Sequence, residues 1–252
     1  QQYKEFFTHV AHMPGEPWLT LHNKNEGTLE FTNLLFIPQK RPFDLYHPER
    51  ARRVKLYVKR VFITDKDIDI VPQWLRFLRG VVDSEDLPLN ISRETLQHNP
   101  ILTKIRKAVT KRVLTELKKK AENDPKSYEI FWQEFGGAVK EGLCDTLEDK
   151  EAIIEICRFH STHGEELTSL DTYIARMPKE QEDIYYLTGD SLEELRKHPL
   201  LEGFTTRGVE VLLLSDHVDD FWTVVFPEYK EKNLKSITRS GIDLSKISSN
   251  PT

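Results

Sequence analysis

The sequence predicts a mixed α/β protein, with two α/β/α sandwich lobes joined by a helical coil linker. Strand-like and helical patterns alternate before residue 93, residues 93–158 follow an almost unbroken helical pattern, and alternation resumes afterwards. We therefore expect a larger lobe at residues 1–122, a helical connector at 123–158 and a smaller lobe at 159–252.

The first lobe is expected to open with a helix near residues 2–12, whose apolar face is carried by Phe6, Phe7 and Val10. Three runs rich in β-branched and aromatic residues then predict strands at Trp18–His22, Leu29–Ile37 and Val54–Ile63. Proline and charged clusters separate these runs, as is typical of loops between strands.

A short helix is predicted between Pro72 and Gly80, because proline favours the first helical position and glycine the position after the last. Its apolar residues are Trp74, Leu75 and Leu78. Val81–Val82 then reads as a buried strand. The order strand, helix, strand implies a right-handed crossover in a mixed sheet.

Helical spacing continues through residues 93–158, with apolar positions at Leu102, Ile105, Val109, Val113, Leu117, Tyr128, Trp132 and Phe135. Asn123–Pro125 is expected to separate two helices, since proline ends or starts a helix. Gly136–Gly137 is expected to weaken the second helix.

The second lobe is expected to repeat the α/β pattern. Ile184–Leu187 predicts a strand ended by Gly189, and Ser191 with Glu194 forms a capping box for a helix. Val209–Leu214 is a continuous apolar run, as expected for a strand buried on both faces. A further helix is predicted from Asp216, containing Phe221, Trp222 and Val225.

Composition is typical of a soluble globular protein, with 31% charged and 38% hydrophobic residues among 252. No apolar run approaches the roughly 20 residues of a membrane-spanning helix, so no membrane association is expected. Residues 1–125 carry a net charge of +6 and the remainder −11, which suggests that the two lobes face different partners.

No metal site is expected. Cys144 and Cys157 have no partner histidine or cysteine at zinc-site spacing, and reduced thiols are the better interpretation. Two histidine pairs, His9 with His12 and His160 with His163, also lack a convincing ligand set. The chain has no initiating methionine and ends at Ser248–Thr252 without a closing element, so we expect a piece of a longer protein.

The most informative segment lies between Gly80 and Gln97. After three acidic residues and the rigid turn Leu87–Leu89 come Asn90, Arg93 and Gln97. If a helix starts at Ser92, Arg93 and Gln97 share one face, and an arginine beside an amide suits a phosphate group. The alternative is a surface arginine that pairs with Glu94 or another nearby acid.

Long segments of the chain resemble the heat-shock protein 90 chaperone family, especially its bacterial members, and their order is that of the family's middle domain. These segments are Phe31–Pro38, Arg41–Leu45, Val54–Thr64, Trp74–Glu94, Leu167–Leu170, Tyr173–Met177 and Ile184–Gly189. The resemblance covers nearly the whole chain and is far more specific than a short motif.

The resemblance implies that Arg93 belongs to a catalytic loop and reaches the γ-phosphate of ATP held by a separate N-terminal domain. It implies that Gln97 helps to place the reaction and that Asn90 belongs to the same loop. The chain itself contains neither a phosphate-binding loop nor the family's Asp-x-Gly-x-Gly nucleotide signature. ATP and Mg are therefore expected in the full-length ATPase, and no enzymatic activity in this fragment alone.

The resemblance further implies a cytoplasmic protein that forms a homodimer through a C-terminal domain and binds partly folded client proteins. Phe221 and Trp222, beside three aspartates, are candidates for client contact, although a core-facing helix explains them equally well. Trp18 is a weaker candidate for an exposed aromatic contact.

Other function classes stay open. A basic stretch could make the chain a nucleic-acid-binding adaptor, although a solvated helix face is favoured by the acidic overall charge, and no nucleic-acid partner is expected. The basic residues are Lys104, Arg106, Lys107, Lys111, Arg112, Lys118, Lys119 and Lys120. A free-standing phosphoryl-transfer enzyme would need a nucleotide cradle that the sequence lacks, and a structural spacer is the plainest alternative.

Overall fold

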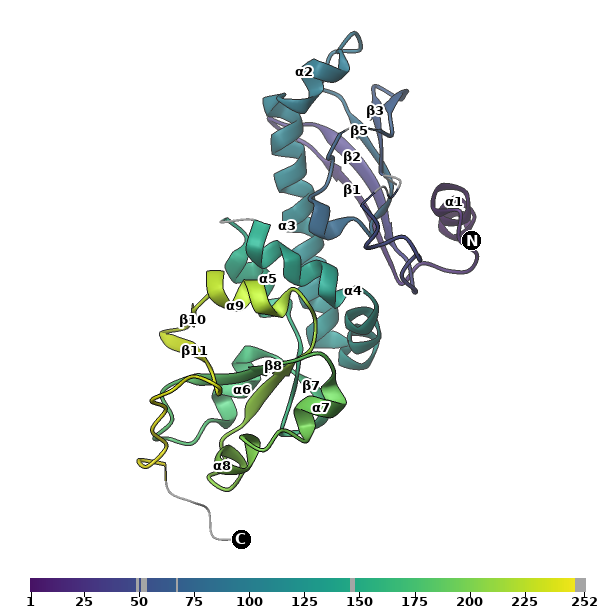
Figure 1. The fold of residues 1–252 in the computed structure, drawn as a ribbon. Helices are drawn as coiled ribbons and strands as arrows, with labels where there is room; N and C mark the ends of the chain where they lie inside the picture. The colour runs from purple at the N-terminus through teal and green to yellow at the C-terminus, as the bar shows by residue number, and fades with distance from the viewer. Residues whose placement is uncertain (49, 51–53, 67, 146–147, 248–252) are drawn as a thin grey trace. The chain divides into compact units, whose positions relative to one another are not determined.

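The computed structural model describes residues 1–48, 50, 54–66, 68–145 and 148–247, and it confirms a mixed α/β fold with two sheets (Figure 1). The chain divides into two compact units, Gln1–Ala138 and Val139–Thr252. The boundary between them falls within one helix, α4 (Pro125–Asp145). The three-part division predicted from the sequence stays a prediction.

The first unit contains a five-stranded sheet in the order β1-β2-β5-β3-β4. Its strands are β1 (Leu19–Asn25), β2 (Phe31–Ile37), β3 (Val54–Val58), β4 (Val61–Thr64) and β5 (Arg79–Ser84). Only β3 and β5 pair in parallel, and the remaining neighbours are antiparallel. Mixed pairing of this kind follows from the chain segment that crosses from β3–β4 back to β5.

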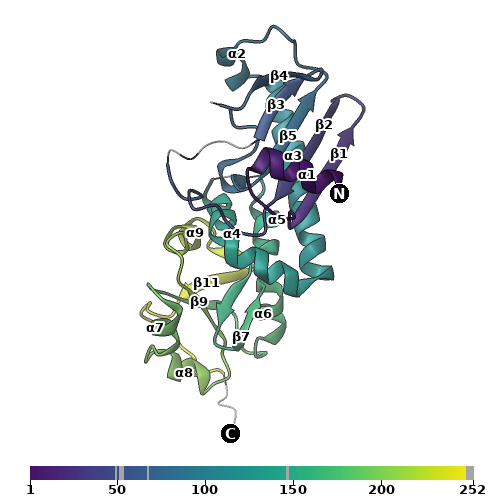
Figure 2. The same ribbon diagram turned by 90° about the vertical axis from the view of Figure 1, so that its right-hand side faces the viewer.

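Helices cover both faces of this sheet. Helix α1 (Gln2–Ala11) lies on one face and α3 (Pro100–Asn123) on the other, as both Figure 1 and Figure 2 show. Phe7 of α1 packs edge-on against Phe36 of β2, with ring centroids 5.5 Å apart. The predicted helix near residues 2–12 and its apolar face are thereby confirmed.

The predicted single strand Val54–Ile63 is wrong, because the chain reverses at Lys59–Arg60 to form the β3–β4 hairpin. Both turn residues have positive φ, 48° and 66°, as a tight two-residue hairpin requires. The turn is held by β5: the Lys59 amide donates to the Ser84 carbonyl at 3.0 Å, and the Arg60 amide donates to Asp83 Oδ1 at 3.2 Å. These tertiary contacts offset the strain of two non-glycine residues.

The predicted helix between Pro72 and Gly80 shrinks to one 3₁₀ turn, Gln73–Leu75. Gly80 does not end a helix but lies inside β5, opposite Leu35 of β2, with a φ of 132°. A Cβ at this position would lie 2.0 Å from the Leu34 carbonyl oxygen. Glycine is required here by the close approach of two backbones rather than by a helix end.

The helical region is confirmed in the described residues as α2 (Arg93–Gln97), α3, α4 and α5 (Lys150–Ile156). The predicted break at Asn123–Pro125 is also confirmed, since α3 ends at Asn123 and α4 begins at Pro125. Gly136–Gly137 does not interrupt α4. A Cβ at Gly136 would lie 2.6 Å from the Trp132 ring, so this glycine makes room for an aromatic side chain.

The second unit contains a six-stranded sheet in the order β10-β11-β8-β9-β6-β7. Its strands are β6 (Phe159–Ser161), β7 (Gly164–Thr168), β8 (Ile184–Thr188), β9 (Val211–Leu214), β10 (Glu228–Tyr229) and β11 (Lys232–Ser236). The strands predicted after Ile184 and Val209 are confirmed as β8 and β9, and every residue of β9 is buried.

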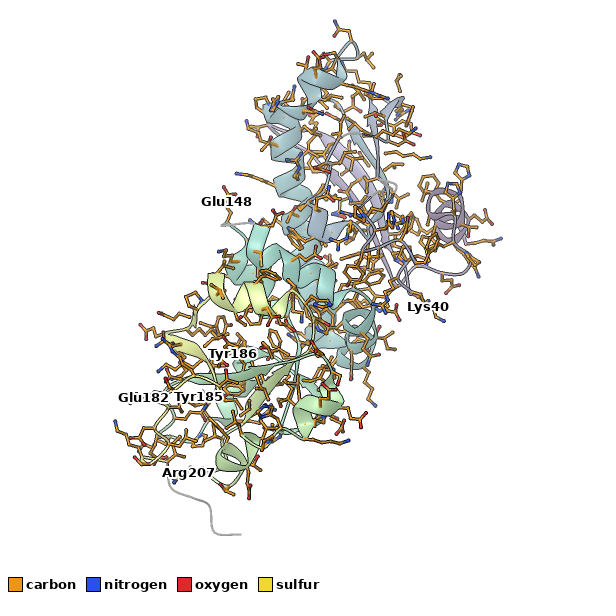
Figure 3. All side chains as sticks on the ribbon, in the orientation of Figure 1. Lys40, Glu148, Glu182, Tyr185, Tyr186 and Arg207 are labelled. Carbon is orange, nitrogen blue, oxygen red and sulfur yellow. The ribbon has the colours of Figure 1, made fainter. Side chains whose placement is uncertain are left out.

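Short helices accompany this sheet: α6 (Leu170–Arg176), α7 (Leu192–Arg196), α8 (Leu201–Thr205) and α9 (Asp219–Val225). The predicted cap is confirmed, since Ser191 Oγ accepts the Glu194 amide at 3.2 Å. Tyr185 and Tyr186 are neighbours on β8 and so face opposite sides of the sheet (Figure 3). Tyr185 packs on Phe204 of α8 at 5.1 Å. Among the described helices, none combines the length and the apolar character that a membrane span needs.

We expect Gly80→Ala to lower the free energy of unfolding by roughly 2–4 kcal/mol, because both the φ value and the Leu34 carbonyl oppose a side chain. Gly203→Ala is the matched control. Gly203 lies in α8 with open space around it, so alanine should leave stability unchanged or raise it by up to about 1 kcal/mol. Urea denaturation measures both, and equal stability of the two variants would refute the close-approach argument.

Candidate functional site

The segment that joins β5 to α3, residues 85–99, is the first candidate site and is called the arginine loop below. Its start is tied to the neighbouring strands: the Glu85 amide donates to the Glu30 carbonyl at 3.0 Å, and Asp86 Oδ2 accepts the Glu30 amide at 2.7 Å. Leu87 is fully buried, and its amide donates to Ser84 Oγ at 3.2 Å. The loop therefore leaves the sheet in a defined direction.

Helix α2 places the arginine. The helix starts at Ser92, as the sequence analysis supposed, and Ser92 caps it, because its Oγ accepts the Thr95 amide at 3.3 Å. Leu96 is fully buried and holds the other side of this single turn against the protein. Arg93 and Gln97 lie one turn apart on exposed positions of α2. Asn90 is also exposed, in the turn closed by the Ile91 amide and the Pro88 carbonyl at 3.3 Å.

Large apolar side chains are exposed near this loop. Leu89 within the loop and Val61 and Phe62 on β4 are each 50% exposed. The β3–β4 turn lies against Asp83 and Ser84, which immediately precede the loop. Exposed apolar groups beside an exposed arginine are typical of a surface that another protein or domain covers.

The arrangement of the arginine loop can supply positive charge but not a complete catalytic centre. The guanidinium of an arginine is a planar cation that can donate two parallel hydrogen bonds to a phosphate. Among the residues that the structure describes, no three His, Cys, Asp or Glu side chains are grouped to hold a metal ion.

The second candidate site is the surface of α9, where the structure corrects the sequence analysis. Trp222 is fully buried, stacks on Phe159 at 5.5 Å and donates from Nε1 to Asp219 Oδ1 at 2.7 Å, so it offers no surface to a client. Phe221 and Val224, in contrast, are 65% and 73% exposed. Together with Val225, they form what we call the α9 patch.

A buried ion pair, which the sequence analysis missed, positions α9. Lys140 Nζ lies 2.7 Å from Asp219 Oδ1 and 2.8 Å from Asp216 Oδ2, and both Lys140 and Asp219 are buried. Burial by itself would lower the pKa of Lys140, but the two carboxylates outweigh it and raise the pKa above 10.5. Asp219, one of the three aspartates beside Phe221 and Trp222, is therefore not part of a client-binding surface but the structural partner of a lysine 79 residues away.

Trp18, the third aromatic candidate, is partly buried and built into the first unit. Its Nε1 donates to Ser127 Oγ at 2.8 Å, and its ring stacks on Phe131 at 4.7 Å. The Lys120 ammonium lies 5.4 Å from the ring centroid. These contacts join the start of β1 to α3 and α4, and they account for Trp18 without a ligand.

The comparisons with known proteins agree along the whole chain. The family model described as Hsp90 protein matches residues 1–251. A protein named chaperone protein HtpG from Wolbachia pipientis wMel is 56% identical over 251 residues, covering 99% of this chain and 40% of the relative. One of the same name from Rickettsia canadensis is 57% identical over 249 residues, again covering 99% and 40%. The chain thus spans about two fifths of these relatives.

A solved structure is also similar. The middle domain of a heat shock protein from Plasmodium falciparum superposes with a TM-score of 0.82 at 29% sequence identity, and 94% of each chain is covered. At this level of similarity both the architecture and the order of the elements are shared.

We expect Lys140→Met to lower the free energy of unfolding of the second unit by about 3–5 kcal/mol, because the buried side chain of Asp219 then loses its lysine partner. Since folding raises the pKa of Lys140, the ion pair contributes fully to the free energy of unfolding at neutral pH, and this contribution is lost only above pH 10.5. The loss should therefore be constant between about pH 6 and 9. Adding Asp219→Asn should recover much of the lost stability in urea denaturation, and failure to recover any would refute the ion-pair argument.

Proposed function

The chain belongs to the Hsp90 protein family, and on that basis we propose that it acts as the middle domain of an ATP-dependent chaperone of the HtpG type. In this proposal the chain supplies Arg93 to ATP bound by a separate N-terminal domain and offers part of the surface that binds client proteins. The observation that carries the proposal is the exposed arginine on a short, capped helix whose other side is buried.

The physical role proposed for Arg93 is that of an arginine finger from a second domain. Charge develops on the oxygen atoms of a phosphoryl group during transfer, and a guanidinium placed there stabilises it. The Ser92 cap and the buried Leu96 restrict where the helix can point, which reduces the entropy lost when the arginine engages. Gln97, one turn later, is proposed to orient the reacting groups through its amide. Asn90 is proposed to support the loop before the cap.

The apolar side chains near the loop support docking of a neighbouring domain. Burying the exposed parts of Leu89, Val61 and Phe62 removes apolar area from water, at about 25 cal/mol for each Å². Such a contact would bring Arg93 into reach only in the docked state, so that hydrolysis depends on domain closure. ATP and its Mg ion are assigned to the N-terminal domain and not to this chain.

The α9 patch is the proposed client-binding part. Phe221 and Val224 project from a helix that the buried Lys140–Asp219 pair holds in place, so their exposure does not depend on a flexible loop. Partly folded proteins expose apolar segments, which such a patch can cover. The full-length protein is proposed to be a cytoplasmic homodimer that forms through a C-terminal domain.

In the full-length protein, we expect Arg93→Ala to slow steady-state ATP hydrolysis about a hundred- to a thousand-fold while ATP affinity changes by less than about two-fold. Arg93→Lys should recover little, because an ammonium lacks the planar fork of a guanidinium. Lys126→Ala, at an exposed position in the first turn of α4, is the control and should hydrolyse ATP normally. Unchanged hydrolysis in Arg93→Ala would reduce the loop to a structural element.

We expect Phe221→Ser to weaken binding of a reduced, carboxymethylated model client about five- to ten-fold, since an exposed aromatic contact is worth about 1 kcal/mol or more. Stability should change by less than about 0.5 kcal/mol, because the side chain is mostly exposed. Leu200→Ser is the control: it replaces another exposed apolar side chain of the second unit, but one that lies outside α9. Equal client affinity in both variants would remove the α9 patch from the proposal.

A further inference from the structure

A groove in the first unit, away in sequence from both candidate sites, has a lining suited to a ligand. Its volume is about 580 Å³, within the usual range of ligand pockets. Ten residues line it: four from β1, two from β2 and four from α3. We call it the β1–α3 groove. None of its lining residues is acidic.

The pattern of lining residues shows that the groove opens along the edge of β1. On α3 the lining positions are 108, 111, 112 and 115, which form one helical stripe. On β2 they are Phe31 and Asn33, which share one face of the sheet. On β1, however, four consecutive residues, 22–25, line the groove. Because successive strand side chains alternate between faces, a groove that touches all four includes the strand's backbone edge.

Among the strands that the structure describes, none pairs with the outer edge of β1. β1 is the terminal strand in the order β1-β2-β5-β3-β4 and pairs with β2 on one side through all seven of its residues. A terminal strand presents backbone amides and carbonyls that can pair with an added extended segment.

The cationic side chains that line the groove differ in whether they already have a carboxylate partner. Lys24 pairs with Glu26 at 2.5 Å and Arg112 with Glu116 at 3.3 Å, so both are partly neutralised. Lys111, which precedes Arg112 on the α3 stripe, has no side-chain partner among the residues that the structure describes. It is the cation most available to an acidic side chain of a ligand.

Amide side chains line the floor of the groove. Asn33 is only 3% exposed, and its Nδ2 donates to the Leu21 carbonyl at 3.2 Å. Within the described part of the chain its Oδ1 accepts no hydrogen bond, although Asn33 lines the groove. Asn23 lies directly opposite Asn33 on β1. When its side-chain amide is oriented to match its neighbours, its oxygen accepts a hydrogen bond from Arg112 Nε at 2.8 Å. A ligand that donates an N–H into the groove would satisfy the oxygen of Asn33.

From these observations we propose that the β1–α3 groove binds an acidic peptide segment in extended conformation. The peptide backbone pairs with the edge of β1, and its carboxylates face Lys111 and Arg112. An extended acidic peptide fits better than a nucleic acid, because the aromatic side chains of the lining are poorly placed to stack on a base: Phe31 is 4% exposed, and the His22 ring already contacts Tyr3. The groove shares no residue with the arginine loop or the α9 patch, so the proposal does not depend on the proposed function.

The test measures binding of the 252-residue chain to a fluorescein-labelled peptide of about nine residues that alternates glutamate and valine. At about 0.15 M salt we expect saturable binding that weakens at least ten-fold in Lys111→Glu. Lys126→Glu makes the same charge change at an exposed site on α4 outside the groove and should alter affinity less than about two-fold. Both positions are exposed, so both variants are expected to fold.

Two further probes separate edge pairing from simple charge attraction. The same peptide with alternate backbone nitrogens methylated keeps its charge but loses the N–H donors, and it should bind at least ten-fold more weakly. A peptide with lysine in place of glutamate should not bind. Equal affinity for the methylated peptide, equal loss in the two lysine variants, or tighter binding of a thymidine oligonucleotide to the same groove would each overturn the proposal.

Discussion

The pairing of β5 with strands on both sides is the constraint on which the first unit depends. β5 is antiparallel to β2 and parallel to β3, and Gly80 allows the β5 backbone to approach the Leu34 carbonyl. The end of the same strand fixes the β3–β4 turn through Asp83 and Ser84 and starts the arginine loop. One central strand thus determines where both the exposed apolar side chains and Arg93 lie, which is why a small backbone change inside the sheet would move the surface.

In the second unit a buried charge pair has the comparable role. Lys140 and Asp219 are costly to bury separately and stable to bury together, so they specify how α9 meets its neighbours. With Trp222 held inside by Asp219, the next face of the helix presents Phe221 and Val224 to solvent. In both units, therefore, buried residues that have no proposed contact with a partner hold the exposed residues that do. This division is expected where a surface must bind a partner without collapsing onto its own core.

Much of the fold could be predicted from local patterns, because caps, breaks and apolar periodicity act over a few residues. Examples are the helix start at Ser92, the Ser191 cap, the break at Asn123–Pro125 and the buried strand β9. The wrong predictions share one cause: each concerns a residue whose conformation depends on a contact that its neighbours in the sequence do not reveal. The turn at Lys59–Arg60 is stabilised by β5, more than twenty residues later in the chain. Gly136 looked like a helix breaker because nothing local indicates that the Trp132 ring covers it.

The sequence by itself determined the family, the helical and strand content and the position of Arg93 at a helix start, since these depend on residue types and short spacings. Tertiary structure alone decided that Trp222 is buried while Phe221 is exposed, that Asp219 pairs with Lys140, and that β1 and α3 enclose a groove. The physical reason is that burial and charge pairing depend on which distant segments meet, and no local pattern records the partner.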